Sequence, residues 1–493
     1  MTRILYIDID TLRSDHLGCY GYHRNTSPAI DSIAADGLRF QNVYVSDSPC
    51  LPSRSALITG QFGIHNGAIN HGGRRSELWP AAPDRGFTSD LLNTSFASCL
   101  GQAGLRTTTI SSFAPRHSAY HWLTGFDEAL NPGGGGMEDA DDVGPLALDW
   151  IVRNGAADNW FCHVHLWDPH TPYRAPASYG EPFEDDPIPA WYTEELWQQH
   201  RLTAHGPHST FETMGFDAEP AYLGGADKYP RQPRSIGSMD DARRMFDGYD
   251  TGIRYADDCV AAMLDALEGE GVLDDTVIIV TSDHGETLGE LGVYADHQTA
   301  DEYTNHVPMI IRWPGLTAGS SVDTGFHYQI DVAASIVELV GGEVPERWDG
   351  RSFAADLRAN TTARSRQELI LSHAAWTCQR SVRWSNHLLI QTFHDGFHLF
   401  PDIQLFDLDA DPHELNDIAA SEPALVADGQ ARYGKWLAAA LDGAPHPDPM
   451  DEVLHEGGPF HIRNELAGYL LRLRETGRAD FAERLIDTHG GSL

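Results

Sequence analysis

The stretch TVIIVTSDHGE, residues 276–286, joins a strand-like segment to a run of chemically active side chains. Its first six residues are apolar or β-branched, and this composition is typical of a strand buried on both faces of a parallel sheet. Asp283, His284 and Glu286 follow where that strand ends. Because ligands in open parallel sheets bind beyond the carboxyl ends of the strands, the sequence predicts a functional site at this point.

The start of the chain has a similar arrangement. Residues 3–8 form a short apolar run of strand length, and Asp8 and Asp10 lie at its end. Side chains alternate along a strand, so both carboxylates point to one side if the strand stays extended. The two strand ends thus bring together the carboxylates of Asp8, Asp10 and Asp283 and the imidazole of His284. Carboxylate oxygens suit a hard divalent cation such as Ca²⁺, and we predict that Asp8, Asp10, Asp283 and His284 bind one.

Strand and helix patterns alternate along the first two thirds of the chain. Ser27 and Pro28 predict a helix start, with Ser27 as the N-cap and Pro28 at the first position. Further strands are expected at 38–45, 105–110, 160–167 and 307–313, and helices at 240–268 and 329–341. This alternation implies a mostly parallel sheet covered on both faces by helices.

The pattern changes after about residue 360. Short strand-like segments occur at 369–372, 380–384, 387–393 and 403–407. They predict a smaller antiparallel sheet accompanied by helices. We therefore expect a large domain over residues 1–360 and a C-terminal subdomain over residues 361–493.

The composition excludes some classes of partner. The formal net charge is −38, from 72 acidic and 34 basic residues, whereas nucleic-acid binding needs basic patches. We interpret the excess acid as a solvated, halophilic surface whose self-repulsion salt screens. The sequence lacks an apolar run of membrane-spanning length, so no membrane is expected. Its N-terminus runs straight into the first strand without the features of a signal peptide, which predicts a cytoplasmic protein.

Six cysteines are scattered along the chain without a C-x-x-C pair, and this low density argues against a disulfide framework or a zinc ribbon. Cys50 has a distinctive context, since Pro52 is a helix-start signal and Arg54 follows one turn later. A nucleophile at that position lies at the positive end of the helix dipole. For an isolated cysteine, a small buried side chain is the simpler interpretation.

The surroundings of Cys50 resemble a known family. Residues 50–60, CLPSRSALITG, are similar to the sulfatase signature C-x-P-S-R followed by T-G. Further sulfatase-like motifs follow the order expected in that family: DTLRSDHLGCYG at 10–21, WDPHTPY at 167–173, SDHGE at 282–286, a strand from Val307 to Gly315, and LFDL at 405–408 with Asp411, Pro412 and Asn416. The resemblance covers nearly the whole chain.

This resemblance implies an alkaline-phosphatase-like fold, in which the mostly parallel sheet is sandwiched by helices, with residues 1–360 as the catalytic domain. It implies hydrolysis of aryl or carbohydrate sulfate esters with one Ca²⁺. It also implies that a formylglycine-generating enzyme or an anaerobic sulfatase-maturing enzyme oxidises Cys50 to formylglycine. The hydrated aldehyde attacks sulfur and expels the alcohol, and its second hydroxyl then allows collapse to sulfate and aldehyde.

The resemblance assigns roles to other catalytic residues. Arg54 is expected to hold the nucleophile, and His170 to protonate the leaving oxygen. The family's G-K-x-H segment is absent, and we expect Arg116 and His117 to supply its positive charge. The family's two adjacent aspartates are also missing, so either Asp8 serves as a ligand or the site has fewer acids.

Three further residues are predicted to contact the substrate. His297 aligns near a lysine of the family, and an imidazole there would make binding sensitive to pH near neutrality. Asn70 and His71 lie on a segment that is expected to border the site, where ordinary loop polarity is an equally good interpretation.

Two alternatives remain at this point. A phosphonate monoester or phosphodiester hydrolase of the same superfamily shares the C-x-P-S-R motif, so the motif does not separate the two activities. A non-catalytic binding protein on the same fold is favoured if Cys50 stays unmodified. The sequence identifies neither the alcohol part of the substrate nor the oligomeric state.

Overall fold

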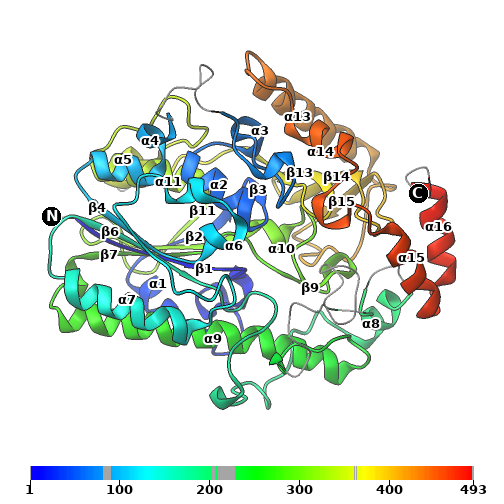
Figure 1. Cartoon of the computed structure of the whole chain (residues 1–493), viewed down its shortest axis with the longest axis horizontal. Helices are drawn as coiled ribbons and strands as arrows, with labels where there is room; N and C mark the ends of the chain where they lie inside the picture. The colour runs from blue at the N-terminus through cyan, green and yellow to red at the C-terminus, as the bar shows by residue number, and fades with distance from the viewer. Residues whose placement is uncertain are drawn as a thin grey trace.

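The computed structural model describes residues 2–80, 90–202, 206–208, 210, 228–359, 361 and 363–490. Within these residues an eight-stranded sheet, in the left half of Figure 1, has the order β11-β2-β10-β7-β1-β6-β4-β5. Its strands are β1 (Arg3–Ile9), β2 (Leu38–Tyr44), β4 (Arg106–Ile110), β5 (Glu128–Leu130), β6 (Trp160–Leu166), β7 (Thr276–Thr281), β10 (His306–Arg312) and β11 (Ser321–Tyr328). Only β10 runs antiparallel to its neighbours, which confirms the mostly parallel sheet.

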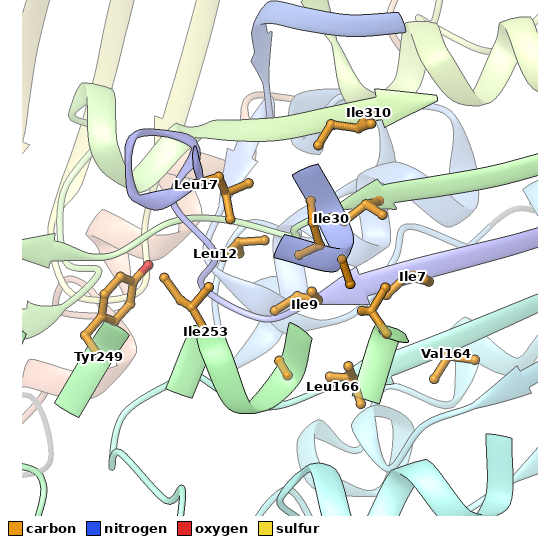
Figure 2. Packing of buried hydrophobic residues seen from close by; sticks show 14 of the residues in the cluster. Ile7, Ile9, Leu12, Leu17, Ile30, Val164, Leu166, Tyr249, Ile253 and Ile310 are labelled. Carbon is orange, nitrogen blue, oxygen red and sulfur yellow. The ribbon is translucent and has the colours of Figure 1, made fainter. Parts of the chain in front are cut away.

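Alternating side chains of β1 pack into two different cores, one on each face of the sheet. Ile7 and Ile9 belong to the core that contains Ile30 and Ile253, as Figure 2 shows. That face is covered by α1 (Pro28–Ala35), α7 (Ala140–Asn154) and α9 (Met239–Gly269). Tyr6 belongs to the core on the other face, which is covered by α2 (Cys50–Thr59), α5 (Phe96–Gln102) and α11 (Gln329–Leu339). Helices therefore cover both faces, as expected.

The start of α1 lies where the sequence predicts, but another residue makes the capping hydrogen bonds. The helix begins at Pro28, but the Ser27 side chain makes no capping hydrogen bond. Instead, the carboxylate of Asp257 on α9 accepts hydrogen bonds from the backbone N–H groups of Ala29 and Ile30, each at 2.9 Å. Ser27 therefore occupies the predicted N-cap position, but a carboxylate distant in sequence accepts the hydrogen bonds that the serine side chain does not.

A second, five-stranded sheet has the order β15-β14-β13-β12-β3. Its antiparallel part comprises β12 (Glu368–His373), β13 (Cys378–Trp384), β14 (His387–His394) and β15 (Ile403–Asp407). The short strand β3 (Asp47–Ser48) joins it by parallel pairing with β12. This pairing anchors the segment immediately before Cys50 to the C-terminal part of the chain.

The C-terminal helices lie beside the second sheet, at the right of Figure 1. They are α13 (Pro423–Leu441), α14 (Pro449–His455), α15 (Leu466–Glu475) and α16 (Ala479–His489). Across the described part of the chain, no helix combines the length and the apolar character needed to cross a membrane.

Candidate active site

Cys50 is the first residue of α2 and is almost fully buried. The helix N-terminus meets the carboxyl ends of β1 and β7, where the predicted ligands lie. The Sγ atom of Cys50 is 3.1 Å from Nε2 of His284. The structure thus brings the predicted nucleophile into contact with His284, which follows β7.

Arg54 lies one turn along α2 and contacts three buried carboxylates. Its Nη2 atom donates to Oδ2 of Asp8 at 2.9 Å, and its Nη1 atom donates to Oδ2 of Asp10 at 3.1 Å. Nη1 also donates to Oδ2 of Asp283. The shared contact confirms that Asp8 and Asp10 point to the same side of the first strand. Arg54 thus forms its hydrogen bonds with the three acids, whereas the resemblance implies that it holds the nucleophile.

The pKa values of these acids reflect competition between burial and Arg54. Burial favours the neutral form of Asp8, but Arg54 and the hydrogen bond to His163 outweigh it and lower the pKa to about 2. The pKa of Asp10 also lies well below its usual range, because Arg54 again outweighs burial. Burial, offset only in part by Arg54 and reinforced by Asp10, raises the pKa of Asp283 well above its usual range. One arginine does not neutralise three buried acids.

The residues present fit a divalent cation. Asp10, Cys50, Asp283 and His284 each offer one ligand atom, and these atoms lie within 4.8 Å of one another. Oδ1 of Asp10 and Oδ1 of Asp8 are buried without a hydrogen-bond partner. A cation at this position would satisfy the unpaired oxygen of Asp10 and supply the missing positive charge. Asp8 is not in this group of four, and Arg54 and His163 contact its Oδ2 atom.

His163 and His165 on β6 contact the two aspartates of β1. Their Nε2 atoms are 3.3 Å and 3.0 Å from Oδ2 of Asp8 and Oδ2 of Asp10, respectively. Both rings are buried, and they orient the two carboxylates from the neighbouring strand. The alternation of the two histidines matches that of the two aspartates, and parallel pairing of β1 with β6 sets them side by side.

A cavity of about 920 Å³ opens above Cys50. Five of the predicted substrate or catalytic residues line it, namely His71, Arg116, His117, His170 and His297. Asn70 does not line it, because this side chain is fully buried and its Oδ1 accepts a hydrogen bond from the backbone N–H of His71. The structure therefore gathers most of the predicted contact residues around position 50 and excludes Asn70.

Comparison with known proteins shows which family the chain belongs to. The model of the family described as Sulfatase matches residues 2–342. The chain belongs to the sulfatase family. A second family model, described as N-sulphoglucosamine sulphohydrolase, C-terminal, matches residues 289–428. Sulfatases are sulfuric ester hydrolases, so family membership makes this chain an enzyme of that class.

Individual relatives are distant but cover most of this sulfatase. An N-acetylglucosamine-6-O-sulfatase of Bacteroides thetaiotaomicron is 24% identical over 88% of this chain and 83% of that protein. The multifunctional alkaline phosphatase superfamily protein PehA of Trinickia caryophylli is 25% identical over 84% of this chain and 90% of that protein.

Solved structures share the fold. One structure, described as a complex with its substrate D-glucosamine-2-N,6-O-disulfate, has a TM-score of 0.70 at 20% identity and covers 90% of this chain and 99% of that one. A phosphonate monoester hydrolase from Silicibacter pomeroyi has a TM-score of 0.64 at 21% identity and covers 91% of this chain and 96% of that one. These likenesses confirm the alkaline-phosphatase-like fold of the sulfatase.

The C-terminal part of the sulfatase forms the outer wall of the cavity, which the sequence did not indicate. Trp376, His461 and Arg463 line it from that side. The rings of Trp376 and His461 stack with centroids 4.0 Å apart. Because these residues are hundreds of positions from Cys50, no local pattern links them to the site.

Three histidines around position 50 are held by their Nδ1 atoms. Nδ1 of His170 donates to the carbonyl oxygen of Thr171, and Nδ1 of His284 donates to that of Gly285. Nδ1 of His297 lies 3.2 Å from Oε2 of Glu286. The neutral rings of His170 and His284 therefore carry their free lone pair on Nε2.

Burial determines the protonation of these rings. It lowers the pKa of His284 to about 3, and it lowers the pKa values of His170 and His297 below their usual range. The pH sensitivity expected from His297 near neutrality therefore moves to lower pH. The neutral His170 ring, with its proton on Nδ1, is not arranged to donate from Nε2, so its expected role as proton donor requires a protonated form that burial disfavours.

Proposed function

We propose that this sulfatase removes sulfate from a carbohydrate sulfate ester, with formylglycine made from Cys50 as the nucleophile and one bound Ca²⁺. The observation that carries this proposal is the position of Cys50, which lies beneath a large cavity and within 4.8 Å of ligand atoms of Asp10, Asp283 and His284. The unmodified thiol suits this reaction poorly. Burial, with the charges of Asp10 and Asp283, raises its pKa well above the usual range, and a neutral thiol is a weak nucleophile.

The two added groups supply a hydrated aldehyde oxygen as the nucleophile and a positive charge beside it. The protein's own residues prepare the site for them. Asp10, Asp283 and His284 hold the cation, and Arg54 balances part of the negative charge of the acids. His165 fixes the orientation of Asp10 through its 3.0 Å contact. The Cys50 side chain is almost fully buried, and burial strengthens these electrostatic interactions.

Arg116 and His117 are placed to bind the sulfate group or its neighbouring oxygens. Both line the cavity, and Nε2 of His117 is buried without a hydrogen-bond partner. Gly136 allows the position of Arg116, because a Cβ atom there would lie 2.6 Å from Cδ of the arginine. A guanidinium at the mouth of the cavity attracts an anion locally, against a net protein charge of −38.

The size and lining of the cavity favour a saccharide as the alcohol part of the ester. Its volume of about 920 Å³ lies near the upper end of small-molecule sites and far exceeds that of one sulfate group. Trp376 and His461, which stack on each other, give the cavity an aromatic wall against which a sugar ring can pack. Two relatives agree in kind with this proposal: one is an N-acetylglucosamine-6-O-sulfatase, and the other was solved in complex with its substrate, a disulfated glucosamine.

A second candidate activity is hydrolysis of phosphonate monoesters or phosphodiesters. The structural likeness to a phosphonate monoester hydrolase and the sequence relationship to PehA support this second activity. Its tetrahedral group has nearly the same size as a sulfate ester, so the charge at the site decides between them. The remaining alternative, a non-catalytic binding protein, requires that Cys50 stays unmodified.

The experiment that tests this proposal is mass spectrometry of the peptide containing Cys50. The chain is co-expressed with a formylglycine-generating enzyme, or with an anaerobic sulfatase-maturing enzyme, and compared with Cys50→Ala. We expect the mass change of thiol-to-aldehyde oxidation, together with one equivalent of Ca²⁺ by elemental analysis. An unmodified Cys50 in both hosts, with no Ca²⁺ retained, would favour the non-catalytic alternative.

We also propose that the acidic surface adapts the protein to high salt. Salt screens the self-repulsion of a chain with 72 acidic and 34 basic residues. The unfolding midpoint should therefore rise with the concentration of potassium chloride. Full stability and turnover in dilute buffer would contradict this interpretation.

A further inference from the structure

We propose that a second pocket, separate from the active-site cavity, binds a small primary ammonium compound. Among the described residues, the two share no lining residue. The second pocket is bordered by β15, by η10 (Glu290–Gly292) and by the C-terminal end of α8 (Glu194–His200). Its volume is about 250 Å³, which lies below the usual range for drug-sized ligands and suits a molecule of only a few heavy atoms.

Two buried oxygen atoms at this pocket lack hydrogen-bond donors. Glu414 and Gln404 both line the pocket, and they are only 2% and 7% exposed. Oε1 of Glu414 accepts a 3.0 Å hydrogen bond from the backbone N–H of Glu302. Oε2 of Glu414 and Oε1 of Gln404 have no partner in the described part of the chain. Buried acceptors without donors are costly, so a ligand with several N–H groups would stabilise both.

The charges around Glu414 favour a cation as that ligand. Burial, together with the charges of Asp301 and Glu302, raises the pKa of Glu414 well above its usual range. The two histidines of the pocket add no opposing charge near neutral pH, because burial lowers the pKa of His200 to about 4 and that of His398 to about 3. An ammonium group would stabilise the ionised form of Glu414 through a charge-assisted hydrogen bond.

Apolar side chains form much of the remaining wall, and they suit the carbon part of an amine. Leu399, Phe406 and Leu415 line the pocket together with Phe400. The ring of Phe400 stacks on that of His398 with centroids 4.6 Å apart. Aromatic ring faces also attract cations. The lining thus combines two acceptors for N–H groups with a surface for a short alkyl chain.

The backbone around the pocket adopts an unfavourable conformation at three positions. Leu291, Leu399 and Glu414 all line the pocket and have φ values of 53°, 60° and 54°, respectively. Residues other than glycine rarely adopt this left-handed region, and such strain concentrates at functional sites. The gathering of three such residues at one pocket supports a binding role for it.

The test is isothermal titration calorimetry of the full-length protein with n-propylammonium chloride, in buffered potassium chloride and without a sulfate ester. We expect one ligand per chain with a Kd of about 1 mM or below. 1-Propanol, which has nearly the same size but no charge, should bind at least about tenfold more weakly. Ammonium chloride, which lacks the propyl chain, should also bind at least about tenfold more weakly. Glu414→Gln should weaken propylammonium binding at least about tenfold.

Glu338→Gln is the matched control, because it removes one carboxylate charge from α11, outside the pocket. It should bind propylammonium as the wild type does, and thermal unfolding should show that both variants are folded. Equal weakening in the two variants would indicate general attraction to an acidic surface and overturn the proposal. Absence of saturable binding to the wild type, or equal binding of 1-propanol, overturns it even if Glu414→Gln fails to fold. The result does not depend on the proposed sulfatase activity, since no ester is turned over.

Discussion

The Nη2 atom of Arg54 donates a 2.9 Å hydrogen bond to Oδ2 of Asp8, and both side chains are almost fully buried. The same guanidinium also contacts Asp10 and Asp283, so one positive charge serves three acids inside the protein. This relationship explains why the site suits a cation and why its stability should depend on one.

Arg54→Gln should destabilise the protein strongly, since removing one partner leaves the buried carboxylates without their counter-charge. We expect a loss of about 3–5 kcal/mol in the free energy of unfolding when Ca²⁺ is chelated. Saturating Ca²⁺ should restore more stability to this variant than it adds to the wild type. Urea unfolding with and without Ca²⁺ measures both quantities.

The matched control is Arg358→Gln, which removes a largely exposed ion pair with Glu338. It should change the free energy of unfolding by less than about 1 kcal/mol. If Arg54→Gln behaves like this control, Arg54 does not balance the buried acids.

Arg116→Gln should weaken substrate binding without changing stability. The side chain is exposed at the cavity, and its positive charge is expected to attract the sulfate group. We expect kcat/KM to fall about 10- to 100-fold, mainly through KM, and the melting temperature to stay unchanged. Steady-state kinetics should compare it with Arg153→Gln, whose exposed arginine pairs with Asp149 on α7. Equal effects of the two substitutions would refute a specific role for Arg116.

Asp257→Ala should destabilise the protein without affecting the chemistry of the site. Its carboxylate caps α1 from α9, and loss of a helix cap typically costs about 1–2 kcal/mol. Asp265→Ala, an exposed position on the same helix, is the control and should have an effect below about 0.5 kcal/mol. Chemical denaturation of the two variants tests the assignment, which fails if they have the same midpoint.

His65 should make stability depend on pH in the neutral range. Its Nδ1 contacts Asp349 at 2.8 Å and its Nε2 contacts the carbonyl oxygen of Ala440 at 2.9 Å, so the doubly protonated ring has an acceptor at each nitrogen. Burial alone would lower its pKa, but the hydrogen bond and charge of Asp349 outweigh burial and raise it.

A raised pKa of a histidine means that the folded state holds its proton more tightly than the unfolded state. The stabilisation is therefore complete below the unfolded value of about 6.5 and is lost as pH rises through the folded value. Wild type should lose more stability between about pH 6 and about pH 9 than His65→Gln does. Parallel pH profiles of the two proteins would show that His65 does not contribute.

Much of the large sheet could be predicted because its strands carry continuous apolar runs. β1 and β7 were recognisable for this reason, and the alternation of Asp8 and Asp10 correctly placed both on the side that faces Arg54. The edge strands β5 and β11 were missed. β5 has only three residues and β11 exposes several side chains, so neither shows a buried-strand pattern.

The parts of the site that escaped prediction depend on contacts between distant segments. Trp376 and His461 reach the cavity because the second sheet and the C-terminal segment fold back over it. β3 is only two residues long, and no local sequence pattern predicts its pairing with β12. The same applies to Asp257, which caps a helix 228 residues earlier in the chain.

The central claim is that a modified Cys50 beside a cation cleaves a sulfate ester. The most direct test compares turnover of an aryl sulfate with that of the matching aryl phosphodiester, in high salt with Ca²⁺, by protein made with a formylglycine-generating enzyme. We predict a strong preference for the sulfate and no activity in Cys50→Ala. Preference for the diester would contradict the proposed substrate class, and full activity in Cys50→Ala would contradict the nucleophile itself.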